Sequence, residues 1–183
     1  ELVLVPIGPL TNIAMAIKKE PKLKGLVKRI HLMGGAINVP GNVTEHAEFN
    51  IYCDPVAANE VMSSGIEIKL CGLDITRNTS VKREETDWLN GNSPGEKVIR
   101  QLLDTVFKKI PDRNYFSLHD PITVLSVLHP ELIEWEMFDV SVICNGSESG
   151  KTLGTVNAEG SVAVGVNIDQ ELAKMKIAEI LSN

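Results

Sequence analysis

Three nearly continuous apolar runs are the feature that most constrains how this chain can fold. They are "ELVLVPI" at residues 1–7, "RIHLMGG" at 29–35 and "IEIKLCGL" at 66–73. Runs of this length with little polar alternation are typical of strands that are buried on both faces, as in parallel sheets covered by helices. We therefore expect three buried strands, with the chain beginning inside the sheet.

Helical segments lie between these runs. Pro9 stands at a first helical position after a glycine, and an apolar face continues to Pro21. Asp54 and Pro55 form an N-cap followed by proline at the first helical position, and Gly65 ends that helix. Alternating strands and helices predict an α/β fold: a mostly parallel, Rossmann-like sheet with flanking helices.

The rest of the chain is richer in helices and then in short strands. Helices are expected at 84–90, at 93–109 (from Ser93-Pro94 with Glu96), from Asp120-Pro121 to about residue 128, and from about residue 169 onward. Short strands, including a hairpin, are expected at 139–143, 152–156 and 161–167. Because no linker, low-complexity segment or repeat interrupts the chain, we expect one domain over residues 1–183.

Composition excludes several classes of function. The chain has 183 residues, 43% of them hydrophobic, which is enough for a core. Its net charge of −6 and its scattered lysines disfavour nucleic-acid binding. No apolar run of membrane-spanning length and no signal peptide is present, so we expect a cytoplasmic protein without a membrane partner. The 3 cysteines match no zinc or redox spacing and are expected to be free thiols.

Polar residues follow each of the three predicted strands. Ile7 ends the first run, Asn42, Glu48 and Asn50 follow the second, and residues 74–76 follow the third. The carboxyl ends of parallel strands meet at one edge of a sheet, which is where ligands bind in such folds. Carboxylate and amide groups at close quarters suit a ligand rich in hydroxyl groups, such as a sugar.

A fourth element, "LHDP" at residues 118–121, places an imidazole beside a carboxylate at the start of a helix. His119 can protonate a departing heteroatom near neutral pH, and Asp120 offers hard oxygen ligands that suit Ca²⁺. A sugar site, an acid and a metal ligand together indicate cleavage of a glycosidic bond.

Each of these residues also has a simpler structural interpretation. Asp120 and Asp54 can be helix caps, Glu48 can be a solvated loop side chain, and Asp74 can hydrogen-bond its own loop. His31 lies inside a strand run and is expected to be structural. Glycine-rich phosphate-binding motifs are absent, which excludes nucleotide binding by that route.

Several segments together resemble the inosine-uridine preferring nucleoside hydrolase family. They occur in the family's order and approximate spacing, from residue 1 to beyond residue 125: "VPIGPLTNIAMAI", "LMGGA", "GNVTEHAEFNIYCDPVAANEV", "GLDIT" and "LHDPITVL". The resemblance implies hydrolysis of ribonucleosides to free base and ribose for nucleoside salvage. It further implies an oxocarbenium-like transition state, a Ca²⁺ that holds the attacking water and the ribose hydroxyls, and a homo-oligomer, dimer or tetramer, for a full-length member.

The resemblance assigns roles position by position. His119 matches the histidine that protonates the leaving base, Asp120 matches a calcium ligand, and Ile7 matches a position whose backbone carbonyl reaches the metal. The remaining matches are to the sugar: Asn42, Glu48 and Asn50 match ribose-binding residues, and Phe49 and Met33 match apolar neighbours of the ribose.

The histidine also bears on base preference. His119 resembles the branch that acts on inosine, uridine and similar nucleosides, so we expect pyrimidine or mixed specificity. Tyr115 and Phe116 can stack on a base or can pack a helix against the sheet.

One family element is missing from the chain. Family members begin with a strand and an aspartate-rich loop, D-x-D-x-G-x-D-D, which supplies most calcium ligands and the general base. We therefore expect residues 1–183 to be the C-terminal part of a nucleoside hydrolase domain, either a fragment of a longer protein or a truncated gene product, and to be inactive alone. The alternatives are a non-catalytic nucleoside- or ribose-binding module and an α/β scaffold whose motifs are relics.

Overall fold

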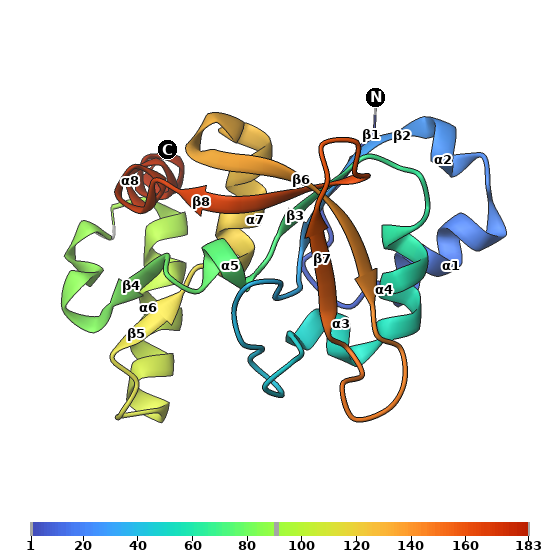
Figure 1. Cartoon of the computed structure of the whole chain (residues 1–183). Helices are drawn as coiled ribbons and strands as arrows, with labels where there is room; N and C mark the ends of the chain where they lie inside the picture. Colours follow the sequence, from blue (N-terminus) through green and yellow to red (C-terminus); the bar gives the residue numbers. More distant parts are fainter. Residues whose placement is uncertain (1, 90–91, 183) are drawn as a thin grey trace.

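The computed structural model describes residues 2–89 and 92–182 (Figure 1). Its main sheet has six strands in the order β1-β2-β3-β8-β6-β7. Their bounds are β1 Leu2–Leu4, β2 Val27–Met33, β3 Ile68–Cys71, β6 Ile133–Val142, β7 Thr152–Val156 and β8 Val162–Ile168. Strands β1, β2, β3 and β8 are parallel neighbours, and β6 runs antiparallel to both β8 and β7. The predicted α/β fold with a mostly parallel sheet is confirmed.

Helices cover both faces of this sheet. Helices α1 (Thr11–Lys19) and α4 (Pro55–Met62) contact each other on one side, whereas α7 (His119–Leu128) packs against β2 and β3. Helices α6 (Pro94–Lys109) and α8 (Gln170–Ser182) lie with α7 at the end of the molecule away from α1 and α4 (Figure 1). This double coverage explains why the strands have apolar residues at successive positions.

Successive side chains of β2 and β3 enter two different cores. Ile30 and Leu32 of β2, with Ile68 and Leu70 of β3, belong to the cluster that includes residues of α1 and α4. Cys71 points into the second cluster, among residues of α6, α7 and α8. The period of two along each strand therefore assigns alternate residues to opposite faces.

Local capping sets the starts of the helices where the sequence predicts them. The Asp54 carboxylate accepts a hydrogen bond from the backbone N–H of Ala57 at 3.0 Å, and Pro55 follows as the first helical residue of α4. At α6, the Ser93 hydroxyl accepts from the N–H of Glu96 at 3.1 Å while the Glu96 carboxylate accepts from the N–H of Ser93 at 3.0 Å. Both predicted caps are confirmed.

The first strand differs from its prediction. β1 spans Leu2–Leu4, occupies an edge of the six-stranded sheet, and leaves Leu2 46% exposed. The expectation that it is buried was wrong because, among the described residues, β1 pairs with a strand only on its β2 side. An apolar run predicts the strand but does not report how many neighbours the strand has.

The sequence also missed short elements and the length of one strand. β6 begins at Ile133, ahead of the expected 139–143, because its first half pairs with β8. The missed elements are α2 (Leu23–Leu26), α3 (Phe49–Cys53), α5 (Leu73–Thr76), the 3₁₀ turn η2 (Pro130–Leu132), and an antiparallel pair formed by β4 (Ser80–Lys82) and β5 (Tyr115–Ser117). The expected helix at 84–90 is a 3₁₀ helix, η1 (Arg83–Trp88), and residue 90 lies outside the described residues. Within residues 2–89 and 92–182, no helix has the length and apolarity needed to cross a bilayer.

A buried polar cluster fixes α7 to the sheet. His31 of β2 is buried, and its Nδ1 lies 2.7 Å from the Ser126 hydroxyl of α7. That hydroxyl donates its one hydrogen to the carbonyl of Thr123 at 2.7 Å, so Nδ1 of His31 must donate to it. The Cys71 thiol also bonds to Ser126 and Thr123, and burial raises its pKa to about 11. The structural role expected for His31 is confirmed.

We predict that His31 makes stability depend on pH. Burial, with the positive charges of Lys69 and Arg29, lowers its pKa from 6.5 to about 4. Because the unfolded chain binds this proton more readily, the stability present above pH 6.5 falls as the pH drops from 6.5 toward 4. The loss is at most about 3 kcal/mol. Urea unfolding at a series of pH values gives the free energy of unfolding at each pH. This free energy should fall between pH 6.5 and pH 4 in the wild type and fall less in His31→Asn. An equal dependence of the free energy of unfolding on pH in both proteins would contradict the role given to His31.

Candidate active site

Backbone hydrogen bonds join the carboxyl ends of β1, β2 and β3 into one surface. The N–H of Met33 donates to the carbonyl of Pro6 at 3.0 Å, and the N–H of Leu73 donates to the carbonyl of Gly35 at 2.8 Å. Ile7 follows Pro6 directly, and its side chain is 45% exposed. The polar loops that follow the three strands therefore meet at one edge, as the sequence predicts.

Glu48 is the most buried carboxylate at this edge. It is 2% exposed and forms the N-cap of α3. Its carboxylate accepts hydrogen bonds from the backbone N–H groups of Asn50 at 2.9 Å, Ile51 at 3.2 Å and Gly35 at 3.1 Å. The interpretation of Glu48 as a solvated loop side chain was wrong, because a short helix begins there and its first N–H groups need an acceptor.

The structure brings Asn50 and Met33 together. The Asn50 side chain is buried, and its Nδ2 donates to the Met33 carbonyl at 3.1 Å and lies 3.2 Å from the Met33 sulfur. The other two predicted sugar-site residues lie closer to solvent. The amide oxygen of Asn42 accepts from the N–H of Phe49 at 2.9 Å, and the Phe49 ring is 53% exposed.

Asp120 lies near Glu48 and beside an apolar cavity. Burial raises the pKa of Glu48, and the Asp120 carboxylate raises it further. Burial also raises the pKa of Asp120, which lines a cavity of about 510 Å³ among apolar side chains of α6, α7 and α8. The helix-cap interpretation of Asp120 was wrong: α7 has Leu118 at its N-cap, and Asp120 lies in the first turn without a capping bond.

His119 precedes Asp120 on the first turn of α7. Its Nδ1 lies 2.8 Å from the hydroxyl of Thr76 in α5. Burial lowers the pKa of His119, and the positive charges of Arg77 and Arg113 lower it further. The imidazole is thus held by a hydrogen bond on one nitrogen, and its surroundings disfavour its protonated form.

The two aromatic residues before His119 lie in different surroundings. Phe116 lines the apolar cavity and packs against the cluster formed with α6, α7 and α8. Tyr115 is 54% exposed at the tip of the β4–β5 pair. For Phe116, the structure favours a role in packing over a role in stacking on a base.

The described residues do not complete a calcium site. Among residues 2–89 and 92–182, no group of three or more His, Cys, Asp or Glu side chains is arranged to hold a metal ion. The Asp120 carboxylate and the Ile7 carbonyl offer too few oxygens for Ca²⁺, which takes about 6 to 8. The Glu48 carboxylate is already occupied by backbone N–H groups.

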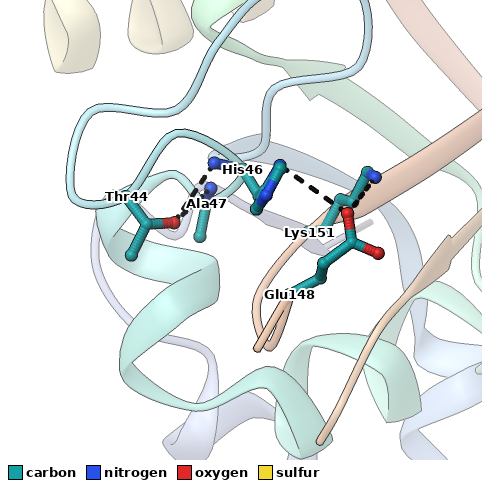
Figure 2. Close-up of polar contacts among 5 residues, drawn as sticks. All are labelled: Thr44, His46, Ala47, Glu148 and Lys151. Carbon is teal, nitrogen blue, oxygen red and sulfur yellow. Dashed lines mark hydrogen bonds and ion pairs between the residues drawn. The ribbon is translucent and has the colours of Figure 1, made fainter. Parts of the chain in front are cut away.

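The segment between β6 and β7 contacts the loop before α3, which the sequence did not predict (Figure 2). Ala47 forms an isolated antiparallel bridge with Lys151, in the segment between β6 and β7. The Glu148 carboxylate pairs with Lys151 and lies 3.7 Å from Nδ1 of His46. No local pattern could have revealed this contact, because the two segments are far apart in sequence.

Comparison with known proteins assigns the fold and site to a class. Residues 1–176 match the family model described as "Inosine-uridine preferring nucleoside hydrolase". The chain is 41% identical over 136 residues to the pyrimidine-specific ribonucleoside hydrolase RihA of Shewanella oneidensis. That match covers 72% of this chain and 42% of the relative.

Solved structures show the same likeness. A purine-preferring ribonucleoside hydrolase from Gardnerella vaginalis superposes with a TM-score of 0.88 at 32% identity, covering 99% of this chain and 60% of that one. An inosine-uridine preferring nucleoside hydrolase from Bacillus anthracis gives a TM-score of 0.84 at 25% identity, covering 99% of this chain and 60% of the other.

This α/β chain, with its polar loops at the carboxyl edge of the sheet, is thus of the nucleoside hydrolase class. It belongs to the inosine-uridine preferring nucleoside hydrolase family. It spans 42% of the length of the Shewanella relative and 60% of the Gardnerella structure.

We predict that Glu48→Ala destabilises the protein by about 2–4 kcal/mol, because it leaves the first N–H groups of α3 and that of Gly35 without their acceptor. Glu45→Ala is the matched control, since Glu45 is an exposed carboxylate of the same loop. Urea denaturation measures both changes. A loss for Glu48→Ala no larger than that of the control would contradict the capping role.

Proposed function

We propose that residues 1–183 are the C-terminal part of a nucleoside hydrolase domain. In a chain that also carries the aspartate-rich loop, this part binds the ribose and protonates the leaving base while the N-glycosidic bond is hydrolysed to free base and ribose. The observation that carries the proposal is the convergence of a buried Glu48–Asn50–Met33 group with Asp120 at one sheet edge. Family membership supports it.

Asn42 and Asn50 are proposed to contact the ribose hydroxyls. The amide oxygen of Asn42 is bound to Phe49 N–H, which leaves its Nδ2 as a donor. The Nδ2 of Asn50 is bound to Met33, which leaves its amide oxygen as an acceptor. Glu48, which the resemblance matches to a ribose-binding residue, fixes the backbone N–H groups of Gly35, Asn50 and Ile51. Phe49 and Met33 are proposed to supply apolar contact to the sugar.

His119 is proposed to be the general acid. As the C–N bond breaks through an oxocarbenium-like transition state, its electron pair moves to the base, and the protonated imidazolium form of His119 donates a proton to the base and becomes neutral. Because Nδ1 is bound to Thr76, Nε2 is the ring nitrogen available to donate. We propose pyrimidine or mixed base preference, which His119 and the name of the Shewanella relative support.

Asp120 and the Ile7 carbonyl are proposed as two of the oxygen ligands of the family's calcium ion. Since Ca²⁺ requires more oxygens than these provide, the 183-residue chain should bind it weakly. Cytoplasmic location, a role in nucleoside salvage and a homo-oligomeric state are further proposals that rest on the family resemblance alone.

We predict that the isolated chain releases no ribose from uridine or inosine, because its described residues offer too few calcium ligands and its sequence lacks the aspartate-rich loop that supplies the family's general base. Added ribose should nevertheless stabilise the folded chain and so raise its melting temperature. The free energy of stabilisation grows with the ratio of ribose to Kd and reaches about 2.7 kcal/mol at a hundredfold excess over Kd. A reducing-sugar assay and a thermal-shift titration measure the two effects. Appreciable turnover would contradict the first part.

The thermal shift also separates the alternatives. A non-catalytic ribose-binding module predicts stabilisation without turnover in any longer form of the chain, whereas a relic scaffold predicts no shift. The residues encoded upstream of Glu1 separate the enzyme from the binding module. An aspartate cluster after an apolar strand favours the enzyme, and a natural start codon directly before Glu1 favours the binder.

In a longer form that carries the aspartate loop, His119→Ala should lower kcat by about 10²–10⁴-fold on nucleosides with poor leaving bases, because general acid catalysis contributes about that much. Activated aryl ribosides need no proton and should lose far less. Asn50→Ala should lower turnover on both kinds of substrate, since it acts on the sugar. Equal losses on both substrates in His119→Ala would remove the acid role.

A further inference from the structure

Helix α5 and its C-cap residue Arg77 carry three polar side chains that contact the loop after β2 and the His119 imidazole. We propose that Asp74, Thr76 and Arg77 are positioning residues that hold the sugar loop, defined as residues 36–48, and the His119 imidazole in one fixed arrangement. This inference rests on the proposed function insofar as it gives the loop a sugar to bind.

Asp74 fixes the start of the sugar loop. Its two carboxylate oxygens accept separate hydrogen bonds, one from the N–H of Ile37 at 3.1 Å and one from the N–H of Asn38 at 2.8 Å. The interpretation that Asp74 bonds to its own loop was wrong, because these N–H groups belong to the loop that follows β2. A carboxylate that accepts two backbone N–H groups holds their orientation more strongly than a neutral acceptor would.

Arg77 fixes the point at which the loop folds back. Its Nη2 donates to the carbonyl of Gly41 at 2.9 Å. The backbone is very close there, since a Cβ at Gly41 would lie 2.3 Å from the carbonyl oxygen of Ala47. The next residue, Asn42, donates its N–H to that same Ala47 carbonyl at 3.1 Å. Arg77 therefore acts one residue away from an amide that is proposed to bind ribose.

Thr76 links the same helix to the base side of the site. It is fully buried, and its hydroxyl lies 2.8 Å from Nδ1 of His119. The α5 helix is itself held firmly, because Leu73 and Ile75 are buried and the N–H of Leu73 donates to the carbonyl of Gly35. One rigid four-residue helix thus contacts both the sugar loop and the imidazole.

The contact between α5 and the loop is tested with Arg77→Met and Arg77→Lys, the second of which keeps a donor for the Gly41 carbonyl. Arg83→Met is the matched control, because the Arg83 guanidinium also donates to backbone carbonyls, those of Phe107, Pro111 and Arg113, but not to the sugar loop. Hydrogen exchange at the N–H groups of Asn42 and Val43 should be about tenfold faster in Arg77→Met, near wild type in Arg77→Lys, and unchanged in Arg83→Met.

The same variants are titrated with ribose by thermal shift. If the wild type binds ribose, Arg77→Met should keep the wild-type fold but bind ribose about tenfold more weakly. Arg77→Lys should bind ribose with most of the wild-type affinity. Exchange or ribose binding like wild type in Arg77→Met would overturn the inference. If ribose does not bind the wild type, the proposed function fails in this chain, and the exchange rates alone decide whether Arg77 holds the loop.

The contact with the imidazole is tested by nitrogen chemical shifts of the histidine rings. Thr76→Val should change the Nδ1 shift of His119, whereas Thr76→Ser, which keeps the hydroxyl, should leave it near wild type. The rings of His46 and His129 serve as internal controls because they contact Glu148 and Glu131 instead. An unchanged His119 signal in Thr76→Val would overturn the role of Thr76.

Discussion

The buried carboxylate of Glu48 is the interaction on which the candidate site depends. It caps α3 and at the same time accepts from the N–H of Gly35, immediately after β2. A carboxylate that is 2% exposed is costly to bury without donors, and here three backbone N–H groups supply them. These donors belong to two segments, the one that follows β2 and the first turn of α3. The Glu48 side chain therefore fixes both segments, and with them Asn50, relative to one another.

The same edge is rigid because the strands beneath it are covered on both faces. β2 and β3 direct Ile30 and Leu70 toward one core and His31 and Cys71 toward the other. The bond from His31 to Ser126 ties α7 to the sheet, so the first turn of that helix, where the proposed acid lies, is set by the position of β2. Groups from three separate elements are therefore brought together without a contiguous motif.

The parts of the proposed site differ in how completely the described residues form them. The group that is proposed to bind the sugar has its own internal hydrogen bonds, and the His119 imidazole has a hydrogen-bond partner in Thr76. The donors proposed for calcium, in contrast, are one carboxylate and one carbonyl, and no group of three or more ligating side chains occurs in the part of the chain that the structure describes. In the proposed function, sugar recognition and protonation of the base thus depend on contacts different from those that would activate water.

The sequence alone determined the strands at β2 and β3, the helices that begin at Asp54 and Ser93, and the α/β class, because these follow from local periodicity and caps within a few residues. It also gathered the polar loops at one edge, since parallel strands end together. Only the tertiary structure decided that β1 is an edge strand, that Glu48 is buried, and that Asp120 is no cap. It alone showed that Arg77 reaches Gly41, 36 residues away. Such contacts join segments that are distant along the chain, so no local spacing in the sequence encodes them.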